Sequence, residues 1–158
     1  MKRIASIVGG MVLAAGSLLF MSPSANAASY GCAGSEIDSY ALKTSGGVTN
    51  GTIHLFYDSS SGKNCAVAVA SSAGGYGTPT LKMVWLMKCP AGYKAGASCD
   101  DAHDAYVQDP AVGSSTKYSQ YAGPVSLSAA GRCIAVGGSI TSPSGTNAHY
   151  TTYATHCG

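Results

Sequence analysis

Residues 51–70 read GTIHLFYDSSSGKNCAVAVA, two runs of alternating side chains around a polar centre. Apolar residues recur at every second position in both runs, first at Ile53, Leu55 and Tyr57 and then at Cys65, Val67 and Val69. A period of two is typical of β-strands. The segment 58–64 between the runs is dense in turn-forming residues. We therefore predict an antiparallel hairpin with strands at 51–57 and 64–71.

The next apolar segment, 80–88, follows the same alternation. One face of this strand carries, in order, Leu81, Met83, Trp85 and Met87, and the other begins and ends with Lys82 and Lys88. We expect the face with the tryptophan to belong to the core. Because aromatic rings dominate core packing, we interpret Trp85 as a buried structural residue.

Shorter alternating patterns complete the predicted fold. Further strands are expected at 37–43, 118–121, 124–128, 132–136 and 148–155. The apolar positions in 35–42 also fit helical spacing, so a short helix is the alternative there. Many short strands separated by Gly, Ser and Pro are typical of an all-β domain, here a small antiparallel β-sandwich or partly closed barrel stapled by three disulfides.

The first 27 residues have the pattern of a secretory signal peptide. Lys2 and Arg3 precede an apolar run over 4–20, and Ala25-Asn26-Ala27 is a small-residue cleavage site. The run contains glycines and is at the short end of the roughly 20 residues that span a bilayer, which disfavours a membrane anchor. We predict cleavage after Ala27 and a secreted, extracellular domain over 28–158, with no membrane span of its own.

Six cysteines follow the predicted cleavage site: Cys32, Cys65, Cys89, Cys99, Cys133 and Cys157. An even number in an exported chain indicates disulfides, and six cysteines allow 15 pairings. Cys89 and Cys99 enclose a short loop and are the first pair we expect. Pairing Cys32 with Cys65 and Cys133 with Cys157 then staples each end of the domain. The cysteines have no Cys-x-x-Cys spacing, so no metal site is expected from them.

The charges of the domain exclude one class of partner. After residue 27, seven Lys and Arg balance seven Asp and Glu, and the cations are scattered singly. Nucleic-acid binding requires a clustered basic surface, so we expect no nucleic-acid partner. The chain also lacks a Gly-x-Ser-x-Gly motif, and its histidines are dispersed. We therefore assign no catalytic residue, no cofactor and no enzyme activity, and keep a hydrolase as the least favoured alternative.

The segment 89–113 holds several Gly and Pro residues and is interpreted as a loop insertion between strands. Its acidic cluster, Asp100, Asp101 and Asp104 beside His103, lacks the ligand spacing of a calcium loop, so a solvated loop is favoured and no metal is predicted. The Cys89–Cys99 loop presents Lys94 and would suit a protease inhibitor. Its two glycines argue against the rigidity that such inhibitors need.

Tyrosines outnumber phenylalanines ten to two, and four of them occur in the later predicted strands. These four, the candidate binding residues, are Tyr118, Tyr121, Tyr150 and Tyr153. Tyrosine has an apolar ring with a polar tip and is suited to wet interfaces and sugar platforms. Ordinary half-buried sheet tyrosines are the alternative. The functional interpretation is a carbohydrate-binding module with a tyrosine-rich face.

Several short motifs resemble those of a known family. They are Ser61-Gly62-Lys63-Asn64-Cys65, Tyr121-Ala122-Gly123-Pro124-Val125, Gly131-Arg132-Cys133, Gly137-Gly138-Ser139-Ile140 and Cys157-Gly158. In this order they resemble the secreted spore-associated proteins of actinomycetes. The segment 89–109, with two of the cysteines, departs from the usual four-cysteine pattern. The resemblance implies a non-catalytic protein at the spore or cell-wall surface whose partner is a wall or spore-surface component, with a glycan as one candidate.

Overall fold

The computed structural model describes residues 29–100 and 102–158, so the predicted signal peptide lies outside the described residues. Eight strands make up the fold: β1 (Ser35–Lys43), β2 (Thr49–Asp58), β3 (Lys63–Ala70), β4 (Lys82–Lys88), β5 (Ala105–Asp109), β6 (Tyr121–Ser128), β7 (Ile134–Thr141) and β8 (Asn147–Thr151). Every pair of neighbouring strands is antiparallel. Within the described part of the chain, no helix has the length and apolarity that crossing a membrane requires.

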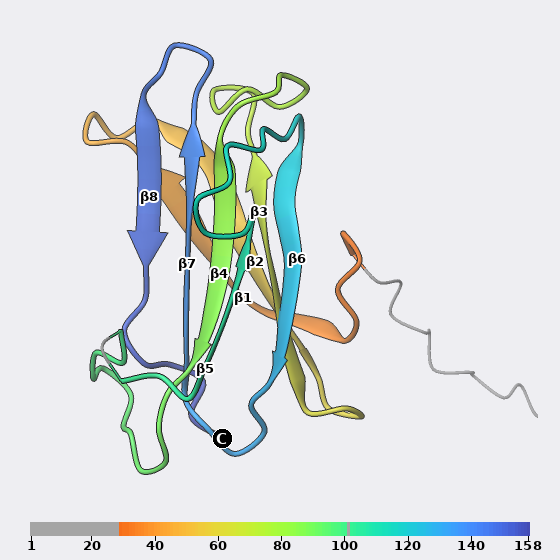
Figure 1. The fold of residues 1–158 in the computed structure, drawn as a ribbon, viewed down its shortest axis with the longest axis vertical. Coiled ribbons are helices and arrows are strands. Elements are labelled where there is room, and N and C mark those ends of the chain that lie inside the picture. The colour runs from red at the N-terminus through yellow and green to blue at the C-terminus, as the bar shows by residue number, and fades with distance from the viewer. Residues whose placement is uncertain (1–28, 101) are drawn as a thin grey trace, which may run out of the picture.

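The strands form one sheet in the order β5-β4-β7-β8-β1-β2-β3-β6, and this sheet folds back on itself. Figure 1 shows β1, β2 and β3 behind β8, β7 and β4, with β6 returning to the front. The two end strands, β5 and β6, are not joined by a ladder. An isolated bridge between Thr80 and Tyr118 instead joins the segments that precede β4 and β6. The predicted all-β sandwich or partly closed barrel is confirmed.

The core lies between the two layers and is built from the inward positions of each strand. The predicted hairpin is present, with Ile53 opposite Ala68 and Leu55 opposite Ala66. Alanines on β3 leave room for larger side chains from the facing layer, among them Val84, Ile134 and Val136. Segment 35–42 is part of strand β1, so the helical alternative is wrong: tertiary pairing with β2 decides between two patterns that the sequence supports equally.

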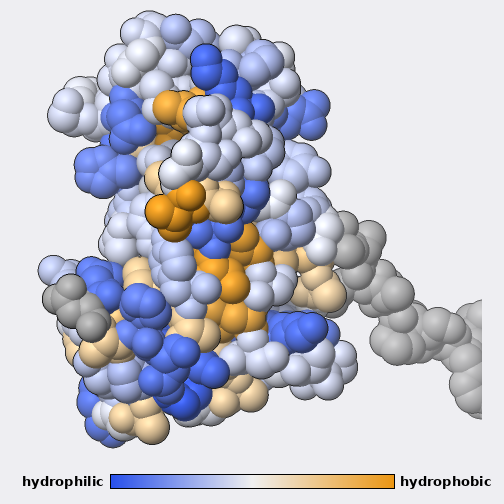
Figure 2. Space-filling view, viewed as in Figure 1, coloured by the Kyte–Doolittle hydropathy of each residue, from blue (hydrophilic) through white to orange (hydrophobic). Residues whose placement is uncertain are grey.

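The predicted orientation of β4 is wrong. Its inner face carries Val84 and Leu86, both fully buried, together with Lys82, while Leu81 is 47% exposed. Trp85 is only partly buried and packs on the outer face. Figure 2 shows strongly apolar residues in the middle of this face, with hydrophilic residues above and below. The alternating pattern shows that a strand has two faces, but it does not show which face is inside. Here the face that contains Lys82 is inside, because oxygen atoms surround its ammonium group.

Two other sequence assignments need correction. Strand β5 lies inside the predicted loop insertion 89–113, because the polar, turn-rich context concealed a five-residue strand that pairs along β4. Strand β7 runs through Gly137 and Gly138, well past the predicted end at 136. These glycines are in the strand because each faces a close neighbour across it.

Three disulfides join Cys32 to Cys65, Cys89 to Cys99, and Cys133 to Cys157. These are the pairs expected from the sequence. Cys32 and Cys65 belong to an apolar cluster on the outside of β2 and β3. Cys89, Cys99 and Cys133 belong to a second outer cluster around Met87 and Trp85. Cys157 is bonded to Cys133 but is itself exposed. The disulfides therefore support the outer faces of the sheet, where the main core does not reach.

Gly137 gives the first testable prediction. A Cβ atom at this position would lie 2.3 Å from Cζ2 of Trp85, which crosses the glycine on the neighbouring strand. Gly137→Ala forces the indole to move and is expected to cost about 1 to 3 kcal/mol of unfolding free energy. Urea denaturation followed by fluorescence of the single tryptophan measures both the loss and the ring displacement. Gly46→Ala is the control, since its nearest neighbour is 3.8 Å away; equal midpoints for the two variants would contradict the packing argument.

Candidate functional site

Strands β1 and β8 are neighbours in the sheet but are paired at one position, Lys43 opposite His149. Strand β1 stays paired with β2 as far as Ser35, so the opening is on its β8 side. In Figure 1 the two strands diverge toward the lower end of the molecule. Tyr40 of β1 and Tyr150 of β8 stack in this opening, with ring centroids 5.3 Å apart and planes inclined by 16°. We call the opening the β1–β8 seam.

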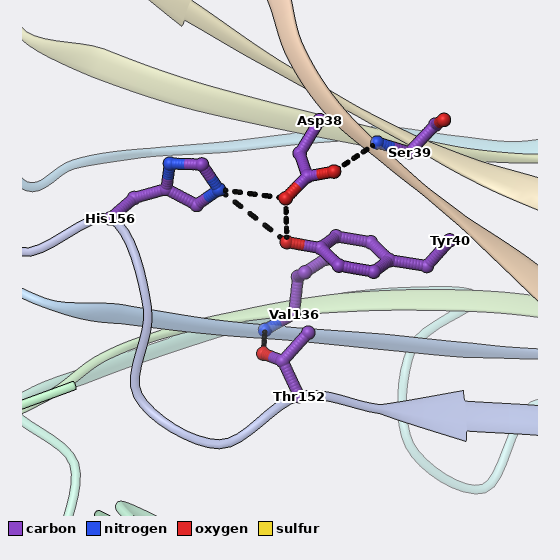
Figure 3. Close-up of polar contacts among 6 residues, drawn as sticks. All are labelled: Asp38, Ser39, Tyr40, Val136, Thr152 and His156. Atoms are coloured by element: carbon purple, nitrogen blue, oxygen red, sulfur yellow. Dashed lines mark hydrogen bonds and ion pairs between the residues drawn. The ribbon is translucent and has the colours of Figure 1, made fainter. Parts of the chain in front are cut away.

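A polar cluster extends the seam (Figure 3). The Tyr40 hydroxyl donates a hydrogen bond to Oδ2 of Asp38 at 2.7 Å. Nε2 of His156 lies 3.2 Å from the same carboxylate oxygen and 3.4 Å from the Tyr40 hydroxyl. Carboxylate, phenol and imidazole therefore converge at the surface, beside the stacked rings.

The chain that follows β8 fixes the position of His156. The Thr152 hydroxyl accepts a hydrogen bond from the backbone N–H of Val136 at 3.0 Å, as Figure 3 shows. Thr155 then pairs with Ile134, and Cys157 is held by its disulfide. His156 between these anchors has φ of 46°, a conformation that side chains rarely adopt. Such backbone strain is found preferentially at functional sites.

The cluster fixes the protonation of two of its members. Burial, followed by the hydrogen bond to Asp38, raises the pKa of Tyr40 well above its usual value. The hydrogen bond from Tyr40 is the main cause that lowers the pKa of Asp38. At neutral pH Asp38 is ionised and Tyr40 keeps its proton. The cluster thus offers a charged acceptor and a protonated phenol at the surface.

A groove of about 360 Å³ adjoins the cluster at the end of the sandwich where the chain terminates in Figure 1. Its walls include Ile37, Tyr57, Asn64, Ala129, Ala130 and His156. Ile37 lies where the pairing of β1 with β2 shifts register, between Glu36 and Asp38. Bulges of this kind often re-aim side chains next to functional sites. His156 joins the groove to the seam.

The four tyrosines proposed from the sequence lie in different places. Tyr150 belongs to the seam. Tyr118 packs against the core and its hydroxyl donates to Asp109 at 2.7 Å. Tyr121 covers the outer cluster around Cys65, with the ring of Tyr30 5.6 Å away. Tyr153 is 68% exposed in the segment after β8. The structure therefore does not gather them into one surface, and their role in binding stays a prediction.

The loop candidates are engaged in local contacts. Asp101 lies outside the described residues, while Asp100 accepts a hydrogen bond from Ser98 and Asp104 is paired with Arg132. Among residues 29–100 and 102–158, no three His, Cys, Asp or Glu side chains are grouped as a metal ion requires. The Cys89–Cys99 loop is also tied to the C-terminal segment, through hydrogen bonds of Gly96 and Ala97 with Ala154. Its use as an inhibitor loop remains untested.

Four members of the site were not predicted from the sequence. Asp38 and Tyr40 share a face of the predicted strand 37–43, which is a detectable signal. His156 is 118 residues from Asp38, and only the fold brings them together. Asn64 is part of one of the family-like motifs, although nothing in that motif indicates an orientation toward a groove.

Comparison with known proteins places the chain in a family. It is 32% identical over 110 residues, 70% of its length, to spore-associated protein A of Streptomyces coelicolor. The chain belongs to the spore-associated protein A-like family. The match spans 55% of that relative's length, about half of it. No protein-family model matches the chain, and no solved structure matches it. Membership confirms the resemblance expected from the sequence motifs.

Proposed function

We propose that this protein is secreted, associates with the spore or cell-wall surface, and acts there by binding without catalysis. The relationship to spore-associated protein A carries the proposal. Three disulfides within the described chain support it, because disulfides persist in oxidising compartments such as the cell exterior. The partner is a component of the cell wall or spore surface.

The seam is the surface that we assign to this binding. Tyr150 is 39% exposed, so part of its ring is available while Tyr40 supports it from beneath. Asp38 and His156 add polar groups beside the hydroxyl of Tyr40. An aromatic platform with hydrogen-bonding neighbours suits a hydroxyl-rich polymer.

Binding of the purified, oxidised domain 28–158 to insoluble wall material and to spores tests the proposal. We expect saturable binding that falls roughly 3- to 10-fold in Tyr150→Ala, the loss of one aromatic contact of about 0.5 to 1.5 kcal/mol. Tyr150→Phe keeps the ring and is expected to retain most of the affinity. Sedimentation of the protein with the insoluble fraction over a concentration series gives the binding curve.

Tyr76→Ala is the matched control, because Tyr76 is 53% exposed and lies in the connection between β3 and β4. Thermal melting of each variant shows whether the loss of the Tyr40 stack has changed the fold. If neither walls nor spores retain the unaltered domain, the proposed function is wrong. If they retain it and Tyr150→Ala binds equally well, the seam is the wrong surface.

A further inference from the structure

Asn64 is a buried polar residue whose side chain is not used by the protein. It is 4% exposed, on the inner face of β3 at the end of the sandwich, and it lines the groove. Its amide forms no hydrogen bond with the residues that the structure describes, while its backbone is paired on both sides. The amide keeps access to solvent through the groove, so water or a ligand can satisfy it there.

Asn50 shows what a structural asparagine does in the same fold. It is 1% exposed, and its Nδ2 donates to the carbonyl oxygens of Ile140 and Thr146 at 3.1 and 3.0 Å. These bonds tie β2 to β7 and to the loop that follows it. Asn64 makes no comparable contact and opens onto the groove instead. The difference indicates that the Asn64 amide is kept for a partner that enters from solvent.

The groove identifies the chemistry of that partner. A primary amide offers two N–H donors and one carbonyl acceptor, so it can donate to the carbonyl oxygen of another amide or accept from its N–H. Next to Asn64 the walls are apolar, formed by Ile37, Ala129 and Ala130. A ligand group that matches both features is an acetamido group, in which an amide carries a methyl group. Its methyl fits against the alanines while its carbonyl oxygen accepts a hydrogen bond from Nδ2 of Asn64; in a trans amide the N–H points the opposite way.

The residues at the rim of the groove indicate what else the ligand contains. Tyr57 supplies an aromatic side chain within the groove, and His156 with Asp38 supplies hydrogen-bonding groups at the surface. The volume of about 360 Å³ is at the small end of the range for ligand pockets, roughly 300 to 1,000 Å³. A single ring bearing hydroxyls fits this size and this mixture of groups better than an extended peptide.

We propose that the groove binds the acetamido group of an N-acetylhexosamine unit, with Asn64 as the residue that recognises it. The proposal deepens the proposed function and rests on it, since a wall polymer supplies the sugar. The stacked pair in the seam then contacts neighbouring units of the same chain, and His156 belongs to both surfaces.

The test is an NMR titration of the isotopically labelled, oxidised domain 28–158 with N,N′,N″-triacetylchitotriose. We expect the side-chain amide signals of Asn64 to shift with the acetylated sugar and to stay in place with fully deacetylated chitotriose. Both arms use the unaltered protein, so they do not depend on a variant that folds. Equal shifts with both sugars would overturn the assignment, as would larger shifts of the same signals with an N-acetyl dipeptide amide.

Asn64→Leu provides an independent arm. It replaces the amide by an apolar group of similar size, so affinity for the trisaccharide is expected to fall at least about tenfold while the thermal midpoint stays equal or rises. A purely structural asparagine would give the reverse, a lower midpoint with unchanged affinity. Asn147→Leu, on exposed β8 at the other end of the sandwich, is the matched control and is expected to bind as the unaltered protein does.

Wall sedimentation in parallel separates the two proposals. Retention on walls without any response to the trisaccharide overturns the acetamido site and leaves the surface function standing. A specific response to the trisaccharide without retention on walls or spores supports the site and contradicts the surface function.

Discussion

Lys82→Ala is expected to lower the free energy of unfolding by about 3 kcal/mol. Lys82 is 1% exposed on the inner face of β4. Its ammonium group donates to Oγ1 of Thr80 and to the carbonyl oxygen of Tyr118, both at 2.7 Å, and to the carbonyl oxygen of Thr78 at 3.2 Å. The substitution leaves three oxygens without this donor and a cavity where the aliphatic stem packs.

The loss is large because Lys82 supports the junction between the two end strands of the sheet. Strands β5 and β6 meet there through single contacts: Asp109 accepts hydrogen bonds from the Tyr118 hydroxyl at 2.7 Å and from the Gly123 N–H at 2.6 Å. Burial, with the neighbouring carboxylate, raises the pKa of Tyr118 to about 12, so this hydroxyl keeps the proton that it donates. Lys82 holds the backbone of Tyr118 in place for these contacts.

Urea denaturation at neutral pH measures the effect. Lys82→Met keeps most of the volume and removes the donors, so it is expected to cost about 1 to 2 kcal/mol. Lys117→Ala removes an exposed lysine from the adjoining loop and is expected to change the unfolding free energy by less than about 0.5 kcal/mol. A Lys82→Ala variant as stable as Lys117→Ala would show that the junction does not depend on this side chain.

Lys82 also marks the limit of what the alternating pattern can predict. The sequence predicts a strand at 80–88 and the structure has one at Lys82–Lys88, yet the sequence assigns the inner face to Met83 and Trp85. The partners that make a buried lysine tolerable include Tyr118, which is 36 residues away. No local pattern reveals such a set of oxygens, so the wrong face was favoured.

The disulfide pairs show the opposite case. Cys89 and Cys99 are close in the sequence and are paired first. Joining the remaining four cysteines to their nearest neighbours in sequence order then proposes the other two pairs. The hairpin is equally local, since β2 and β3 follow each other directly. The candidate site is not local: Tyr40 meets Tyr150, and Asp38 meets His156, only because β1 and β8 are neighbours in the folded sheet.

Removal of the Cys32–Cys65 disulfide is expected to lower the free energy of unfolding by about 4 kcal/mol, the chain-entropy value for a loop of this length. The two cysteines are 33 residues apart, the longest separation among the three disulfides. A double change to alanine avoids placing hydroxyl groups in the apolar cluster with Phe56 and Val67. Since domains of this kind are stable by about 5 to 15 kcal/mol in total, the loss is a large fraction.

The same bond anchors the segment that precedes β1, so its removal has a local signature as well. Tyr30 lies against Tyr121 and His54, with ring centroids 5.6 and 5.7 Å apart. Without the disulfide, Tyr30 is held mainly by these contacts, and hydrogen exchange in the segment is expected to rise before the rest of the domain opens.

Calorimetry of two double-alanine variants, each lacking one disulfide, shows whether the disulfides stabilise the domain by loop closure or by packing. Cys32→Ala with Cys65→Ala is expected to melt roughly 10 to 20 °C below the unaltered domain. Cys89→Ala with Cys99→Ala removes the disulfide that closes a loop of separation 10 and is expected to cost less, about 3 kcal/mol. The reverse order would mean that the Cys89–Cys99 bond acts through packing around Trp85 and Met87, not through loop closure. It would then be a support of the outer face of β4, where the sheet has no second layer to cover it.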